Sequence, residues 1–310
     1  MSEWRTLQAD RGDHGVRVDL VLLRHLREEK GVSRNRIQQW IDAGDVLVNG
    51  ASAKRASWRI QAGDDLQVRL TRIAVRERPK AEKIPLDILY EDDDLLALNK
   101  PAGLVVHPSY KHATGTLMNG LLDYATRWPS GSAPALIGRL DKLTSGLVLV
   151  SKRREIQAAL QRAAAARRVD KDYLAIVRGK PSPIRGTIDL ALDRDPWDRR
   201  RITVTDRGGQ PSVTMYERLT TANGFSIVRC RLITGRTHQI RVHLSAKGWP
   251  IVGDATYGSS AAANVEGMER QALHSWRISL KQPHTGRDLQ IEAPVPADMR
   301  AFAAKVGLAL

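Results

Sequence analysis

The stretch GRLDKLTSGLVLV, residues 138–150, places one carboxylate directly before a buried strand. Residues 147–150 are all apolar and include β-branched valines, which predicts a strand covered on both faces. Residues 144–146, Thr-Ser-Gly, are turn formers that mark where this strand begins. Asp141 stands just before that turn, two positions after Arg139 and directly before a lysine. The pattern therefore predicts an acidic side chain at the mouth of a sheet.

Two interpretations of Asp141 follow from this pattern. The simpler one is a structural ion pair with Arg139 that holds the turn. The other is catalytic, because an ionised carboxylate can act as a nucleophile without a metal or cofactor, and neighbouring cations favour the ionised form of a carboxylate. An isolated Arg-Leu-Asp triplet does not decide between them, so the rest of the chain has to.

The composition points to a polyanionic partner. The chain has 310 residues, enough for two domains, with 49 basic and 34 acidic residues and a net charge of +15. Such an excess favours nucleic acid, because cationic surfaces gain affinity by releasing phosphate counterions. No apolar run approaches the roughly 20 residues of a bilayer span, and the first 20 residues do not resemble a signal peptide. We therefore expect a cytoplasmic protein that does not associate with membranes. The lone Cys230 excludes an internal disulfide and a multi-cysteine zinc site.

The first 72 residues predict a small α/β domain. Apolar spacing predicts a helix over 16–26, and Ser33 is a suitable N-cap for a second helix that ends at Gly44. Asn49-Gly50 predicts a hairpin turn. The residues expected on the outer surface of this domain include Arg34, Arg36, Lys54 and Arg55. Residues 73–84 are charged and lack apolar periodicity, which predicts a linker.

Residues 85–310 predict a separate, larger domain. Helical patterns occur at 115–127 and 153–168, and residues 104–108 are expected to form a strand. Short strands, including one expected at 238–244, dominate from residue 170 onward. Runs of strands with inserted helices favour the α+β class. We expect a mixed, mainly antiparallel sheet flanked by helices.

Four separated motifs carry a family resemblance. They are NKPAGLVVHP at 99–108, GRLDKLTSGLVLVSK at 138–152, KDYLAIVRG at 171–179 and TGRTHQIRVHLSAKGWPIVGDATYG at 234–258. Their order and wording resemble the RluA-type pseudouridine synthases, which isomerise uridine in ribosomal or transfer RNA. Residues 15–70 resemble the S-four-like RNA-binding domain, the usual companion of the ribosomal members. The resemblance implies the pseudouridine synthase fold and an isomerase that needs no cofactor.

The resemblance also implies residue roles. Asp141 matches the nucleophile, and Arg241 matches the arginine that pairs with it. Tyr173 matches the tyrosine that stacks on the target base and is a candidate general base. Arg139 matches an arginine that fills the RNA stack after the uridine has flipped out, a step that enzymes acting on a paired base require. RNA contacts are expected at Arg139, His107 and Arg236, and in the N-terminal domain at Arg34, Arg36, Lys54 and Arg55.

No metal site is expected. His238 and His243 lie five positions apart in the predicted strand, so they would point to opposite faces of the sheet. The glycines match neither GxGxxG nor a P-loop, which disfavours a nucleotide cofactor.

Three alternatives remain beside a large-subunit ribosomal RNA pseudouridine synthase. The first is the same chemistry on transfer RNA. The second is a non-catalytic RNA-binding or ribosome-assembly protein, which would not need Asp141, Tyr173 and Arg241 together. The third is a glycosidase, which in most families requires a second catalytic carboxylate. We expect the leading candidate to act as a monomer on large-subunit ribosomal RNA or a pre-ribosomal particle.

Overall fold

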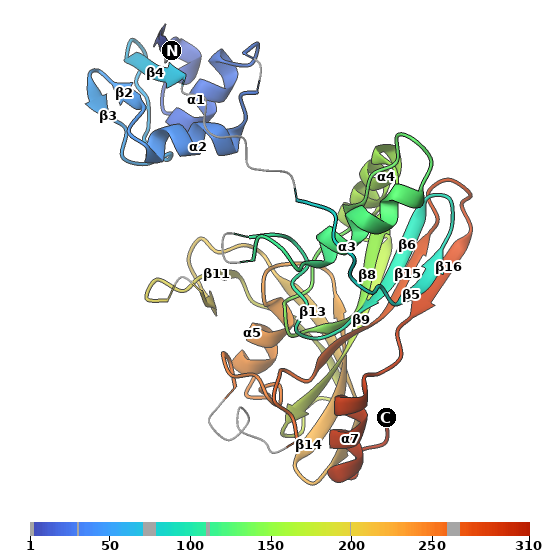
Figure 1. The fold of residues 1–310 in the computed structure, drawn as a ribbon. Helices are drawn as coiled ribbons and strands as arrows, with labels where there is room; N and C mark the ends of the chain where they lie inside the picture. Colours follow the sequence, from blue (N-terminus) through green and yellow to red (C-terminus); the bar gives the residue numbers. More distant parts are fainter. Residues whose placement is uncertain (1–2, 30, 71–78, 110–111, 199, 259–266) are drawn as a thin grey trace. The chain divides into compact units, whose positions relative to one another are not determined.

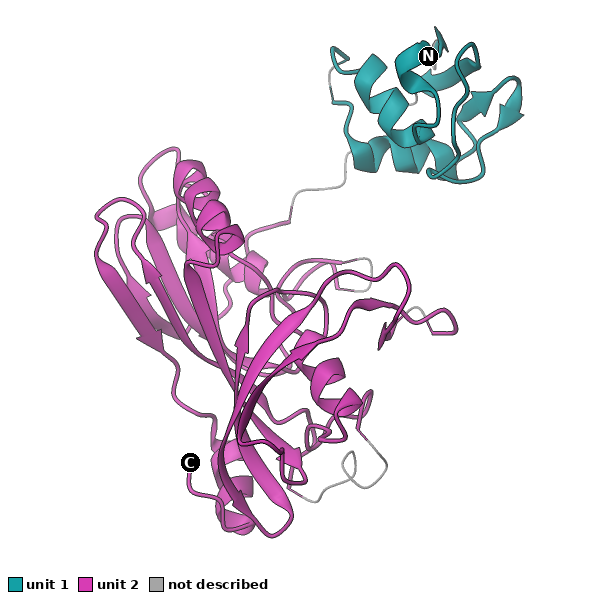
Figure 2. Ribbon diagram, turned by 180° about the vertical axis from the view of Figure 1, so that it is seen from behind, with its two compact units in different colours: residues 1–78 teal, residues 79–310 magenta. Residues whose placement is uncertain are grey.

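The chain forms two compact units, Met1–Arg78 and Pro79–Leu310 (Figure 2). The computed structural model describes all residues except 1–2, 30, 71–78, 110–111, 199 and 259–266. Residues 73–78 of the predicted linker lie outside the described residues. The rest of the linker belongs to the second unit, because the Asn119 side chain donates to the Lys80 carbonyl and the Glu82 amide donates to the Asn119 carbonyl. No described helix combines the length and apolar character that a bilayer crossing requires.

Unit 1 is a four-stranded sheet packed with two helices. Its elements are β1 (Glu3–Gln8), the 3-10 helix η1 (Arg11–Asp13), α1 (Val18–His25), α2 (Arg34–Asp42), β2 (Val46–Val48), β3 (Ala51–Ser52) and β4 (Asp65–Leu70). The strand order is β1-β4-β2-β3, with every neighbouring pair antiparallel.

Local sequence accounts for the ends of these elements. The Ser33 hydroxyl accepts from the Arg36 amide and caps α2, which confirms the predicted N-cap. Asn49 and Gly50, between β2 and β3, both adopt positive φ, as the predicted hairpin turn requires. The predicted apolar face of α2 is buried at Ile37, Trp40 and Ile41.

Unit 2 is built on a ten-stranded, mainly antiparallel sheet (Figure 1). Its main path runs β10-β13-β14-β9-β15-β8-β6-β5, with β16 beside β15 and β7 beside β8, and only the β15–β8 pair is parallel among the described strands. The strands are β5 (Ile88–Glu91), β6 (Leu95–Lys100), β7 (Ala135–Leu136), β8 (Ser145–Ser151), β9 (Val169–Arg178), β10 (Arg185–Asp189), β13 (Val213–Ala222), β14 (Phe225–Leu232), β15 (Leu273–Lys281) and β16 (Asp288–Glu292). A separate hairpin joins β11 (Leu192–Arg194) and β12 (Ile202–Val204).

Helices cover both faces of this sheet, which confirms the predicted fold class. The helices of unit 2 are α3 (Leu117–Tyr124), the 3-10 helix η2 (Ala125–Arg127), α4 (Arg154–Ala165), α5 (Gln239–Ala246) and α7 (Ala297–Lys305). Leu147 and Leu149 of β8 pack in one core cluster with α4, whereas Val148 and Val150 pack in another with α3. Alternate side chains of a strand face opposite ways, and both faces are covered here, so residues 147–150 of β8 are all apolar.

Two predicted strands are absent. Residues 104–108 form no strand. Residues 239–246, within and beyond the stretch expected as a strand, form helix α5. Apolar residues alternate with polar ones in this segment, which imitates a half-buried strand. Residues 239–244 of the helix are nevertheless all buried, because the polar side chains of Gln239, Arg241 and His243 find partners inside the protein.

The start of β8 requires glycine at position 146. Gly146 has φ +104°, and a Cβ there would lie 2.2 Å from the Ser275 carbonyl oxygen of β15. We predict that Gly146→Ala destabilises unit 2 by more than about 3 kcal/mol, because backbone would have to move in a packed sheet. Thermal unfolding measures the loss. Gly235→Ala is the control, because Gly235 has ordinary φ and free space around it. Equal melting temperatures for the two variants would contradict this prediction.

Candidate active site

Asp141 lies in a cleft that three motifs form together. The cleft has a volume of about 290 Å³, near the lower limit of small-molecule sites. Residues 138–141 line it from the loop between β7 and β8, Tyr173 from β9, and residues 232–241 from the end of β14 to α5. The predicted site residues that the fold brings together in this cleft are Arg139, Asp141, Tyr173, Arg236 and Arg241.

Arg241 holds two carboxylates at once. Its Nη1 donates to Asp141 Oδ2 at 3.0 Å, while its Nε and Nη2 donate to Asp254 Oδ2 and Oδ1 at 2.7 and 2.9 Å. The bidentate pair with Asp254 fixes the plane of the guanidinium, so the remaining nitrogen points at Asp141. The Asp141 side chain stays 18% exposed, whereas that of Arg241 is 6% exposed. The carboxylate of Asp141, the candidate nucleophile, is thus exposed to the cleft, whereas the arginine that orients it is buried.

Asp254 is a residue of the candidate site that sequence reasoning missed. It is 1% exposed and accepts hydrogen bonds from the Thr256 and Tyr257 amides in addition to Arg241. Burial by itself raises the pKa of Asp254, but the Arg241 hydrogen bond and charge outweigh it and lower the pKa below the usual 3.8. The signal that could have found it is a carboxylate that directly follows a buried apolar pair and a glycine, Ile251-Val252-Gly253.

His238 and Tyr257 complete the wall around Arg241. Tyr257 packs its ring on the guanidinium of Arg241, 4.9 Å from the ring centre, and its hydroxyl lies 2.8 Å from His238 Nδ1. His238 Nε2 lies 3.8 Å from Asp141 Oδ2. Burial lowers the pKa of His238, more than Asp141 raises it, which favours the neutral ring at pH 7. His238 has φ +55°, an uncommon conformation for a histidine.

Tyr173, on strand β9, forms part of the cleft wall. The side chain is 7% exposed and belongs to the apolar core of unit 2. Burial raises the pKa of Tyr173 to about 12, against an opposing hydrogen bond with Ser275. The hydroxyl is therefore protonated at neutral pH, which makes it a weak base and a good donor.

Two buried cations, Lys100 and Arg270, bind backbone carbonyls of the loop that carries Asp141. Lys100 is 1% exposed, and its Nζ donates to the carbonyls of Pro101, Leu104 and Lys142. Arg270 Nη1 donates to the Leu143 carbonyl at 3.1 Å. Burial, and then the charge of Arg270, lowers the pKa of Lys100 to about 8. These contacts fix the backbone directly after Asp141.

The remaining predicted RNA contacts of unit 2 lie on the outside. Arg139, His107 and Arg236 are exposed. His107 does not line the cleft; partial desolvation and then the charge of Arg139 lower its pKa. Arg236 does line the cleft, and its amide donates to Gln239 Oε1.

The predicted RNA contacts of unit 1 divide into two pairs. Arg34 pairs with Asp19 at 3.1 Å, and Arg36 donates to the Gly31 carbonyl. Lys54 and Arg55 are exposed and have no side-chain hydrogen bond or ion pair with another described residue. Lys54 and Arg55 therefore carry positive charge with which no described carboxylate forms an ion pair.

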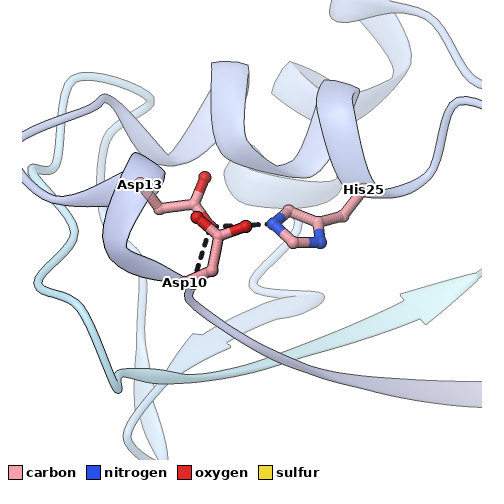
Figure 3. A group of neighbouring side chains, drawn as sticks. All are labelled: Asp10, Asp13 and His25. Atoms are coloured by element: carbon pink, nitrogen blue, oxygen red, sulfur yellow. Dashed lines mark hydrogen bonds and ion pairs between the residues drawn. The ribbon is translucent and has the colours of Figure 1, made fainter.

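One group of possible metal ligands occurs among the described residues, in unit 1. Figure 3 shows Asp10, Asp13 and His25, with His25 Nε2 2.8 Å from Asp13 Oδ2. Arg24 forms ion pairs with both carboxylates, so a cation already occupies this position. The cluster links η1 to α1. His238 and His243 do not converge, because His243 binds Thr214 and the Leu190 carbonyl instead.

Comparisons with known proteins identify the family to which this chain is similar. A family model described as RNA pseudouridylate synthase matches residues 94–246, and an S4 domain model matches residues 16–66. An uncharacterized RNA pseudouridine synthase of Bacillus subtilis, YlyB, is 41% identical over 274 residues, 87% of this chain and 88% of that protein. Ribosomal large subunit pseudouridine synthase D of Nitrosomonas europaea is 40% identical over 293 residues, 93% of this chain and 83% of that protein.

Two solved structures share the fold over about 70% of this chain. The human RNA pseudouridylate synthase domain containing 1 protein aligns with a TM-score of 0.57 and 27% identity, over 69% of this chain and 85% of that one. The human domain containing 4 protein aligns with a TM-score of 0.60 at 24% identity, over 72% of this chain and 94% of that one, which supports the fold alone.

Proposed function

This chain belongs to the RNA pseudouridine synthases, isomerases that convert uridine in RNA to pseudouridine, and we propose that Asp141 is its nucleophile and large-subunit ribosomal RNA its substrate. The observation that carries the first part is the Arg241–Asp141 hydrogen bond of 3.0 Å at the cleft. An open carboxylate with a fixed cation behind it is poised to attack.

The reaction is an internal exchange that needs no outside reagent. The bond between uracil N1 and ribose C1′ breaks, the base turns, and a bond forms between C5 and C1′. The C5 proton leaves and N1 gains a proton, so atoms and electrons balance. Asp141 adds covalently to the sugar or to the base and leaves again. Arg241 stabilises the carboxylate each time it is released.

Tyr173 and Arg139 are placed to act on the flipped uridine and on the gap that it leaves in the RNA, respectively. The ring of Tyr173, in the cleft wall, offers the uracil an aromatic face. Because its phenol is protonated at neutral pH, we propose stacking as its main role and a base role only after its proton has been passed on. Arg139 is exposed at the cleft rim, from which it can fill the vacated position in the RNA stack.

Ribosomal RNA is proposed as the substrate for two reasons. The relative from Nitrosomonas europaea bears the name of a ribosomal large subunit enzyme, and unit 1 matches an S4 domain. Transfer RNA is the alternative. We also propose a cytoplasmic monomer, because Asp141, Tyr173 and Arg241 of a single chain already meet in the cleft.

Mapping of pseudouridine tests the proposal. The purified protein is incubated with unmodified large-subunit ribosomal RNA and, separately, with a pool of unmodified transfer RNAs, and pseudouridine positions are located by chemical labelling. New sites in the ribosomal RNA alone support the proposal. Sites in transfer RNA alone would replace its substrate, and no site in either RNA would refute it.

We predict that unit 1 supplies binding and not chemistry. A truncated chain that starts at Pro79 keeps the whole described core of unit 2 and should stay folded. Each phosphate contact that it loses should lower the slope of log affinity against log salt by about 0.7 to 0.9. The value of kcat/KM should fall far more than kcat, because uniform binding has been removed. Turnover across a salt series measures both, and equal salt slopes for the two chains would show that unit 1 does not contact this RNA.

A further inference from the structure

A second, larger cavity adjoins the Asp141 cleft. Its volume is about 790 Å³, and it lies between the C-terminal half of α4 and the β15–β16 hairpin. Arg167 and Asp170 line both cavities. The two cavities are therefore adjacent, and we call the second one the α4 groove.

The α4 groove carries uncompensated positive charge. Its acidic residues are already paired, Asp170 with Arg231 at 3.1 Å and Asp288 with Lys281 at 2.8 Å. The three arginines of the groove are exposed and form no ion pair or side-chain hydrogen bond with other residues in the described ranges; they are Arg162, Arg167 and Arg168. A polyanion is the ligand that such a surface favours.

The backbone of Arg167 is an independent observation. The Arg168 amide donates to the Ala163 carbonyl and the Arg167 amide to the Ala164 carbonyl, which closes α4 in a Schellman motif. Arg167 occupies the left-handed position of that motif with φ +56°. Glycine is the usual residue there, because a side chain in this conformation costs about 1–2 kcal/mol.

Few residues share this conformation. The described non-glycine residues with positive φ are Asn49, Arg167, Asn223 and His238. Asparagine tolerates the conformation, and His238 stands beside Asp141. Arginine at position 167 thus makes the folded state less stable than glycine would. Residues in such strained conformations cluster at functional sites.

We propose that the α4 groove binds the sugar-phosphate backbone of the substrate RNA where the strand leaves the Asp141 cleft, and that Arg167 contacts a phosphate at the junction. This inference rests on the proposed function, because it follows the RNA outward from the flipped uridine. Arg162 and Arg168 extend the path along α4. The helix dipole also attracts a cation to this end of α4, so the experiment has to separate that structural role from RNA binding.

Two substitutions at Arg167 make this separation. Arg167→Gly removes the charge and relieves the backbone strain, whereas Arg167→Lys keeps both. If Arg167 serves RNA, Arg167→Gly weakens binding of a large-subunit ribosomal RNA fragment roughly tenfold and lowers the salt slope by about 0.7 to 0.9. Its melting temperature stays equal to that of the wild type or rises by a few degrees. Arg167→Lys binds nearly as tightly as the wild type and melts no higher.

Two further variants serve as controls for folding and for the loss of one positive charge elsewhere. Arg167→Asn removes the charge with a residue that tolerates positive φ, so a folding defect in one variant does not decide the outcome. Arg300→Gln removes one exposed charge from α7, which lies away from α4 at the other end of unit 2 (Figure 1), and should leave affinity unchanged.

The outcomes distinguish this inference from the proposed function. Affinity is measured without turnover, so a wild-type protein that modifies no RNA refutes the proposed function while binding still tests the groove. Wild-type affinity and salt slope in Arg167→Gly would overturn the groove alone. A lower melting temperature in both Arg167→Gly and Arg167→Asn, with unchanged affinity, would make Arg167 a structural helix cap.

Discussion

Asp141→Asn is expected to lower single-turnover isomerisation by roughly 10⁴- to 10⁶-fold, the range seen when a catalytic group is removed from a well-studied enzyme. The amide cannot serve as the nucleophile. RNA affinity should stay the same or rise slightly, because the change removes a negative charge that faces a polyanion. Rapid-quench conversion and equilibrium binding on the same RNA measure the two effects side by side.

The fold should survive this substitution, because Arg241 keeps its bidentate partner Asp254. Asp193→Asn, in the β11–β12 hairpin outside the cleft, is the matched control and should isomerise at the wild-type rate. Appreciable turnover by Asp141→Asn would remove Asp141 from the chemistry.

Arg241→Met is expected to damage both activity and stability. Asp254 is 1% exposed and would lose its cation. Stranding a buried charge costs about 3–5 kcal/mol, which corresponds to a drop of roughly 6–20 °C in the melting temperature of a unit of this size. Isomerisation should fall as well, because Asp141 loses the donor that orients it. Thermal unfolding and single-turnover rates measure these effects.

The double variant Arg241→Met/Asp254→Asn separates the two roles. Asparagine has the shape of aspartate without its charge, so most of the stability should return while activity stays low. Recovery of activity together with stability would show that Arg241 supports only the fold. Low stability in the double variant would contradict the stranded-charge explanation.

The stability loss of Arg241→Met should depend on pH. In the wild type the pKa of Asp254 lies below 3.8, so its contribution is present above pH 3.8 and is lost as the pH falls through the folded pKa. Without Arg241, burial dominates and raises that pKa, so the variant gains stability relative to the wild type when Asp254 takes up a proton. The deficit should therefore shrink between pH 7 and about pH 4.5. A constant deficit would place the defect elsewhere.

Local signals in the sequence determined much of this protein. The cap at Ser33, the turn at Asn49-Gly50 and the all-apolar strand at 147–150 follow from short-range chemistry that does not depend on the rest of the fold. The four motifs identified the family, and the model matches and relatives confirm it. The site residues Asp141, Tyr173 and Arg241 stay a prediction, supported by their meeting in one cleft.

Only the tertiary structure decided how polar groups are paired at a distance. Alternation at 238–244 predicted a strand, yet α5 is a helix whose polar side chains are satisfied by partners on other elements. The role of Asp254 depends on Arg241, thirteen positions earlier, and on a turn that aims its carboxylate inward. The α4 groove adjoins the cleft only because the end of α4 brings Arg167 into the lining of both. Apolar periodicity predicts which residues are buried. A buried charge needs a partner, and that partner comes from a distant part of the chain, so only the folded structure determines which residue it is.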